Sequence, residues 1–223
     1  MKKLALLLLS TVVIFFAISV INCHAEIKFI LSEEIASACI TMSGSKTGKG
    51  HVTQTLLYFD INSWYILGWH NYNLQLSDET ERDLFFGKWF EVNNFIIDFR
   101  YKNCVIEGER IHELDGILKY GKIVSLILSK PCADGLTLDD NRFYIEIAYP
   151  FIFGNLTYQP IASTAFLNNF YTESGFAHIT GGASGEYEFT KNISATGYLK
   201  YQHGLMDTKK SQLYGGGGMK VNY

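Results

Sequence analysis

Alternation of apolar and polar residues runs along most of this chain and constrains its fold more than any other feature. Between residues 94 and 102 the odd positions from Phe95 to Tyr101 are apolar or aromatic, and the even positions from Asp98 to Lys102 are charged. The same period of two returns in three further segments: 142–149, 177–189 and 193–202. A period of two is that of a β-strand, and no comparable stripe at the helical period of 3.6 competes with it. The chain is therefore predicted to be all-β.

The first 25 residues have the form of a secretory signal peptide. Two lysines precede an apolar run from Leu4 to Ile21, and a small-x-small site follows at Cys23 to Ala25. A retained membrane anchor and a lipid attached at Cys23 are the alternatives. The basic start and the cleavage-like end favour removal, and Asn22 is too large and polar for a lipidation signal. The expected division is residues 1–25 as signal peptide and 26–223 as one β domain of 198 residues.

Twelve strands account for the domain, with boundaries uncertain by about two to four residues. They are predicted at 35–43, 50–60, 63–74, 83–91, 94–104, 112–120, 122–129, 141–149, 155–164, 175–189, 193–203 and 211–223. No apolar stretch after the signal approaches the roughly 20 residues of a spanning helix, so any membrane residence must use strands. An even number of strands returns both ends to one side of a closed barrel.

The predicted connections alternate in length. Short turns are expected around Asn62-Ser63, Asn93-Asn94, Gly121, Phe153-Gly154-Asn155 and Lys191-Asn192. Longer polar loops are expected at 44–50, 75–82, 107–111, 130–140, 165–174 and 204–210. Short turns at one end and long loops at the other are typical of outer-membrane barrels, whereas a soluble β-sandwich gives no reason for the alternation.

The alternation also predicts which residues line the barrel and which meet lipid, because an apolar outer face leaves the polar face inside. The candidate lumen-lining residues are Asp60, Lys88, Asp98, Arg100, Lys102, Asp115, Lys119, Arg142, Glu146, His178, Glu186, Glu188, Lys200 and Lys220. The candidate membrane-interface aromatics are Tyr65, Trp69, Trp89, Tyr101, Tyr120, Tyr149, Tyr187, Tyr201 and Tyr223. Strand 83–91 fits least well, because Phe86 and Phe90 share the parity of Lys88.

The order of the segments resembles the TorF-type porins of Proteobacteria. A signal, an opening strand over Glu34 to Met42, a Gly-Lys-rich loop over 44–50, a hairpin over Tyr58 to Trp69 and serial hairpins to the terminal Tyr223 carry the resemblance. It covers the layout of the mature chain and shares few specific residues. The resemblance implies an antiparallel up-and-down transmembrane β-barrel of about twelve strands in the outer membrane of a Gram-negative bacterium.

The expected function is therefore transport through a porin or narrow channel, with charged lumen residues selecting small ions or solutes. Paired charges could equally fill a narrow interior and make a non-conducting structural or adhesin barrel. The expected partners are outer-membrane lipids, lipopolysaccharide and the barrel-assembly machinery, the last through the C-terminal strand. A net charge of −3 without a basic run gives no sign of nucleic-acid binding. Neither a cofactor nor a metal is predicted.

A lipid-modifying hydrolase is the enzymatic alternative, and it needs a nucleophile beside a histidine base. His203 and Ser211 share a parity across the last loop, with Asp207 between them, but no G-x-S-x-G motif accompanies them. No catalytic residue is therefore assigned. The cysteines allow one loop disulfide, between Cys104 and Cys132, or free thiols.

Overall fold

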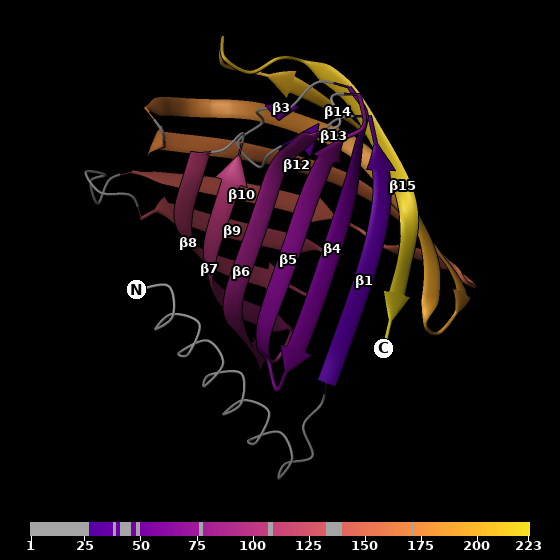
Figure 1. The fold of residues 1–223 in the computed structure, drawn as a ribbon. Helices are drawn as coiled ribbons and strands as arrows, with labels where there is room; N and C mark the ends of the chain where they lie inside the picture. Colours follow the sequence, from indigo (N-terminus) through magenta and orange to yellow (C-terminus); the bar gives the residue numbers. More distant parts are fainter. Residues whose placement is uncertain are drawn as a thin grey trace.

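The computed structural model describes residues 27–37, 39–40, 46–47, 50–75, 78–106, 109–132, 140–170 and 172–223. The predicted signal peptide lies outside these residues. Twelve strands form one antiparallel sheet that closes on itself (Figure 1). They are β1 (Ile27–Ala36), β4 (Val52–Ile61), β5 (Trp64–Asn73), β6 (Asp78–Val92), β7 (Phe95–Ile106), β8 (Glu109–Tyr120), β9 (Val124–Pro131), β10 (Asn141–Ala148), β12 (Leu156–Phe170), β13 (Glu173–Thr190), β14 (Ile193–Gly204) and β15 (Gln212–Asn222).

Two pairings close the ring. β1 pairs with β15 from Ile30↔Asn222 to Ala36↔Gly216, and β10 pairs with β12 from Asn141↔Asn168 to Ala148↔Ile161. Every strand of the ring then has two neighbours, so no edge is left with unpaired backbone groups. The predicted fold, an antiparallel barrel of twelve strands, is confirmed.

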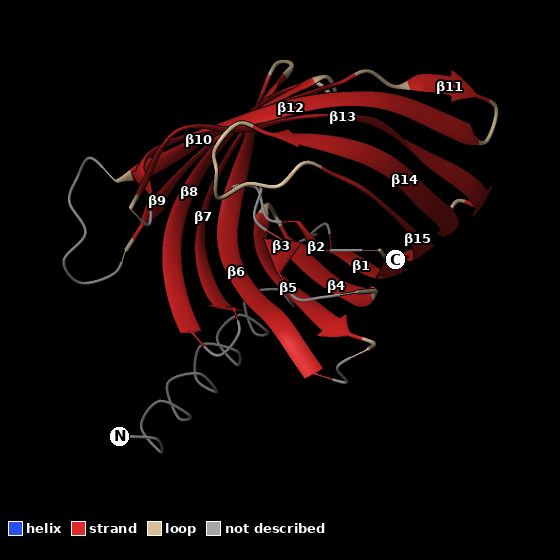
Figure 2. Cartoon of the chain, turned by 90° about the horizontal axis from the view of Figure 1, so that it is seen from above, coloured by secondary structure: helices blue, strands red, loops and turns tan. Residues whose placement is uncertain are grey.

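Three short strands lie outside the ring. β11 (Phe151–Phe153) pairs only with the start of β12. β2 (Cys39–Ile40) and β3 (Lys46–Thr47) form a two-stranded hairpin between β1 and β4. Seen from above, this hairpin lies within the outline of the ring, at the end opposite to the tight turns (Figure 2).

All five predicted short turns are present where the sequence indicates them, and they lie at one end of the barrel. At the β4–β5 turn, Asn62 and Ser63 adopt positive φ values of 52° and 70°, the conformation that a two-residue hairpin needs. The chain leaves β15 at this same end (Figure 1). Long connections follow β9 and β14 at the other end, as predicted.

The opening strand and three loops differ from the predictions. The first strand is Ile27–Ala36 rather than 35–43, and it begins directly after the predicted cleavage site. Residues 78–82, 109–111, 165–170 and 173–174, which were assigned to loops, extend β6, β8, β12 and β13. These strands continue because each finds a neighbour in register, so pairing outweighs the polar composition that suggested loops.

The two faces of the ring differ in exposure. On β7 the outward side chains of Phe99 and Tyr101 are 60% and 39% exposed, whereas Asp98 and Lys102 are buried. This arrangement inverts that of a soluble protein and leaves an apolar outer surface around a polar interior. No helix among the described residues is long and apolar enough to cross a membrane.

Buried apolar residues form only small clusters. Ala165, Leu167, Phe170 and Ala177 pack together between β12 and β13, with Tyr144 against them. Ala36 and Val52 form a second cluster under Trp69 and Tyr198. Most contacts between inward side chains are therefore polar.

Candidate functional site

The candidate site is the polar interior of the barrel, and its densest part is a ladder of ion pairs on β6 to β10. Arg100 Nε lies 2.7 Å from Asp115 Oδ2, and Lys102 Nζ lies 2.9 Å from Asp83 Oδ2. These pairs join directly opposite or neighbouring strands, where the register brings inward side chains of β6, β7 and β8 together. Each cation thereby bridges two strands of the wall.

Arg142 extends the ladder from β10 to the β8–β9 hairpin. Its guanidinium lies 3.3 Å from Glu113 Oε2 and donates a 2.7 Å hydrogen bond to Ser129 Oγ. The guanidinium also stacks over the Phe170 ring, with 4.8 Å between its carbon and the ring centroid. Burial of such a pair is tolerated because both charges keep polar partners.

Two further carboxylates are held by aromatic donors near the end with the short turns. Asp60 accepts hydrogen bonds of 2.7 Å from Tyr58 Oη and from Trp89 Nε1, and one of 3.0 Å from the amide of Ser63. Tyr65 Oη is 2.9 Å from both oxygens of Asp98. The three donors to Asp60 are neutral, so its negative charge is not cancelled by a contact.

The opposite wall, β12 to β15, carries fewer and looser pairs among small residues. Lys220 Nζ is 3.2 Å from Glu186 Oε1, which also accepts a 2.6 Å hydrogen bond from Ser194. Lys200 Nζ reaches Glu146 of β10 at 3.9 Å. Several inward positions here are glycine or hydroxyl residues, so the wall presents little bulk.

Glu81, Asp83 and Cys104 form the one group in the described chain with metal-ligand geometry, with their ligand atoms within 4.8 Å of one another. The ammonium of Lys102 lies 2.9 Å from Asp83 and 3.9 Å from Glu81. Lys102 already supplies the positive charge that these carboxylates need. The group therefore works as part of the ladder and needs no metal to be neutralised.

The predicted lumen residues have the parity of the inner face, with one exception. Thirteen lie on it: Asp60, Asp98, Arg100, Lys102, Asp115, Lys119, Arg142, Glu146, His178, Glu186, Glu188, Lys200 and Lys220. The prediction for Lys88 is wrong, because Lys88 pairs with Trp64 on the outer face and its ammonium lies 4.5 Å from the centroid of that ring. A lysine can reach the interface from such a position along its flexible stem.

Three of the predicted interface aromatics point inward, so those predictions are wrong. Tyr65 is 5% exposed and bonds Asp98, Trp89 bonds Asp60, and Trp69 packs on Ala36 and Val52. The other six are exposed: Tyr101, Tyr120, Tyr149, Tyr187, Tyr201 and Tyr223.

Sequence reasoning missed several inward charges. Glu81 and Asp83 were missed because the inverted parity of β6 and the assumed loop placed them outside the lumen. Glu113 shares the parity of Asp115 and Lys119, so the alternation could have found it. Glu34, which accepts a 3.1 Å hydrogen bond from Thr196, and Lys28, over the Trp89 ring, belong to the misplaced opening strand.

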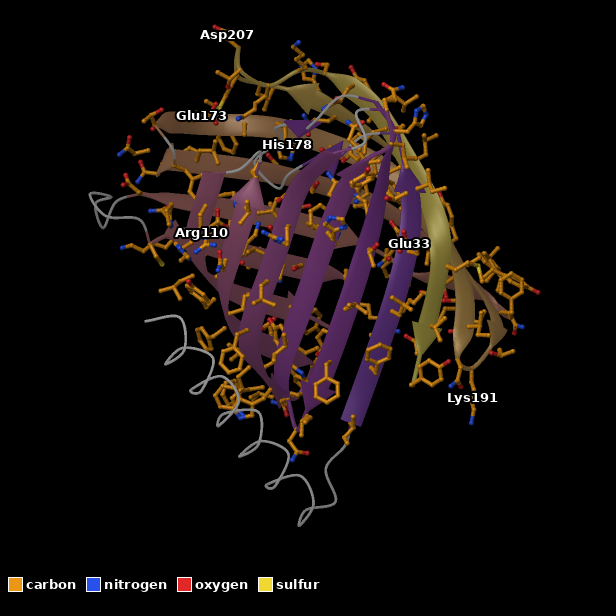
Figure 3. All side chains as sticks on the ribbon, in the orientation of Figure 1. Glu33, Arg110, Glu173, His178, Lys191 and Asp207 are labelled. Atoms are coloured by element: carbon orange, nitrogen blue, oxygen red, sulfur yellow. The ribbon has the colours of Figure 1, made fainter. Side chains whose placement is uncertain are left out.

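The enzymatic alternative is only partly assembled. His203 Nδ1 and Ser211 Oγ lie 3.0 Å apart, but Ser211 Oγ also accepts the amide hydrogen of Gly204. Asp207 lies at the tip of the loop between them (Figure 3). Cys104 and Cys132 are free thiols, one buried and one exposed, so the disulfide alternative does not hold.

Comparison with protein-family models gave no match, and comparison with curated protein sequences gave none. Three solved structures share the fold. A KdgM porin in complex with disordered oligogalacturonate is 10% identical, with a TM-score of 0.57 over 88% of this chain and 99% of that chain. A KdgM porin solved without it gives 0.55 at 10% identity and the same coverage. A NanC porin gives 0.53 at 11% identity over 86% of this chain and 98% of its own. The likeness shows that this chain has the barrel fold of these small porins.

Proposed function

We propose that the chain is an outer-membrane channel that passes small ions and favours cations, in keeping with its resemblance to TorF-type porins. The observation that carries the proposal is the composition of the inner face. Correcting the parity of β6 removes Lys88 from this face and adds Glu81 and Asp83. With Glu34 and Glu113 added as well, carboxylates outnumber cations there, even when Lys28 is included.

The outer membrane is the environment that fits the two faces. In hydrocarbon every backbone polar group must be paired within the protein, and a closed barrel meets this demand. Exposed side chains such as Phe99, Leu199 and Leu213, which are 58–65% exposed, would be costly in water and suit lipid. A bacterial outer membrane receives such barrels after secretion, as the proposed signal peptide requires.

An acidic polymer is a poor candidate for the transported solute. One of the structurally similar porins was solved with oligogalacturonate, which is a polyanion. In this chain Arg100, Lys102 and Arg142 are each within 3.3 Å of a carboxylate, and Lys200 and Lys220 pair at 3.9 and 3.2 Å. These cations are engaged by the wall. The unpaired excess is negative, which attracts cations and repels polyanions.

Planar-bilayer recording of the purified barrel tests the proposal. We expect single-channel conductance and, under a salt gradient, a reversal potential of the sign that cation preference gives. Asp60→Asn should move that potential toward zero, since it removes a charge that no cation contacts. Asp207→Asn, in the exposed outer loop, is the matched control and should change it less. Repeated insertions without conductance would refute the channel, and anion preference would refute the role of the acidic lumen.

A further inference from the structure

We propose that the outer wall of β5 to β8 holds one lipopolysaccharide molecule, with Arg82 and Arg110 on its phosphates and the gap at Gly68 under an acyl chain. The inference rests on the proposed outer-membrane function for the location of this wall. It concerns side chains that face away from the lumen, and it does not need the barrel to conduct.

The wall carries a groove of about 400 Å³ on its outer side. Its lining includes two arginines, Arg82 and Arg110, beside His70 and the apolar residues Leu57, Leu84 and Val105. The groove thus joins a cationic part to an apolar part. A phosphorylated lipid has this same division between headgroup and chain.

The strand register explains how the cationic part forms. His70 of β5 pairs with Arg82 of β6, which pairs with Val105 of β7, which pairs with Arg110 of β8. Neighbouring strands are about 4.8 Å apart, so the backbones of the two arginines are separated by about 10 Å. Both arginines are exposed on the outer face. Side chains of this length can therefore converge on one phosphate or on two linked through a disaccharide.

The depth of the arginines fits the outer headgroups. Ten residues separate Arg82 from Val92 on β6, and ten separate Arg110 from Tyr120 on β8, where the strands end at the short turns. At about 3.3 Å per residue and a tilt of about 40°, this distance corresponds to a height of about 25 Å. That height is the thickness of the apolar band of an outer-membrane barrel. The arginines thus lie at its upper border.

Gly68 opens the apolar part of the groove. It pairs with Leu57 on one side and Leu84 on the other, and these leucines are 48% and 53% exposed. A Cβ built on Gly68 would meet no atom within 4 Å. The missing side chain leaves a slot between two leucines, directly below the row of cationic residues.

The cationic row belongs to one wall. At the same end of β12 and β13 the outward residues are apolar: Phe166, Phe176 and Ile179 are 39–58% exposed. The acidic residue in the row is Glu33 on β1, which accepts a 2.7 Å hydrogen bond from Thr55. Glu33 is three strands from Arg82, and Figure 3 labels Glu33 and Arg110 on opposite flanks of this wall.

Binding of purified lipopolysaccharide to the detergent-solubilised full barrel, measured by native mass spectrometry across a titration, tests the proposal. Arg82→Gln with Arg110→Gln should weaken binding about tenfold or more, because two charge-assisted contacts are lost. Gly68→Phe should also weaken it, by filling the slot. Lipopolysaccharide stripped of its phosphates should bind the wild type as weakly as the intact lipid binds the double variant.

Two matched controls belong to the same titration. Lys88→Gln removes an outward cation at the opposite end, and Gly181→Phe fills an equally open glycine on the far wall. Both should bind like the wild type. Equal affinity of the wild type and the double variant, or undiminished binding of the dephosphorylated lipid, would overturn the proposal. Conductance of all variants should be unchanged, so a barrel that binds lipid without conducting refutes only the channel.

Discussion

The β6–β10 wall and the β12–β15 wall bury their inner faces by different means. On the first, large charged side chains are fixed by short contacts, such as Arg100 to Asp115 at 2.7 Å. On the second, glycines let the strands approach closely, and a Cβ at Gly218 would lie only 1.9 Å from the carbonyl oxygen of Glu33. One wall is therefore held by side chains and the other by its backbone, and the two should fail under different substitutions.

The largest expected effect is on the charged wall. Arg142→Met removes the partner of Glu113 and leaves a buried carboxylate without its cation, so we expect a loss of about 3–5 kcal/mol in unfolding free energy. Urea unfolding in detergent, followed by tryptophan fluorescence, measures it. Combining Arg142→Met with Glu113→Gln should restore much of the loss. A single variant as stable as the wild type would show that the ladder does not hold this wall.

On the glycine wall, Gly218→Ala should weaken the seam between β1 and β15. The added methyl group would collide with the β1 backbone, and overpacking of this kind costs about 1–3 kcal/mol. The measurement is the temperature at which the folded band disappears from an unboiled gel. Gly181→Ala, where the new Cβ meets nothing within 4 Å, is the control. Equal temperatures for the two variants would contradict the close approach at the seam.

A smaller effect is expected where the last loop is fastened to β13. Lys209 is 2.5 Å from Glu173, and although burial opposes it, hydrogen bonds from Lys209 and Thr208 with the Lys209 charge hold the pKa of Glu173 below its ordinary value. A lowered pKa means that the contribution is complete above the ordinary pKa of glutamate and is lost as the pH falls through the lowered one.

Protease cleavage of the loop, measured against pH, tests this fastening. Cleavage of the wild type by an acid-active protease should increase as the pH falls below the ordinary glutamate pKa. Glu173→Gln should be cleaved more readily at neutral pH and should lose the pH dependence in that range. An identical pH profile for both proteins would assign the change to another group.

The comparison of walls also shows which features the sequence could predict. The alternation predicted the closed barrel and the correct parity wherever one face is uniformly apolar, as on β7 from Phe95 to Tyr101. On β5 and β6 both faces carry aromatics, and the choice depends on the cross-strand partner. Tyr65 faces inward because Gly87, opposite it, leaves room for its ring. No local pattern reveals such a pairing before the register is known.

The inner ladder was predictable in composition and not in detail. Charged residues such as Asp98 and Arg100 followed from parity, but their partners depend on the strand register. The excess of carboxylates became visible only once Lys88 was placed outside. Position in the sheet, rather than residue type, decided the sign of the lumen.

The most direct test of the central claim uses two adjacent residues on β14. In a background whose mature cysteines are replaced by serine, Lys200→Cys faces inward and Leu199→Cys, at a position 58% exposed, faces outward. A charged, water-soluble thiol reagent added during bilayer recording should reduce conductance through Lys200→Cys and leave Leu199→Cys unchanged. The reverse pattern, or equal responses, would contradict a channel through the charged interior.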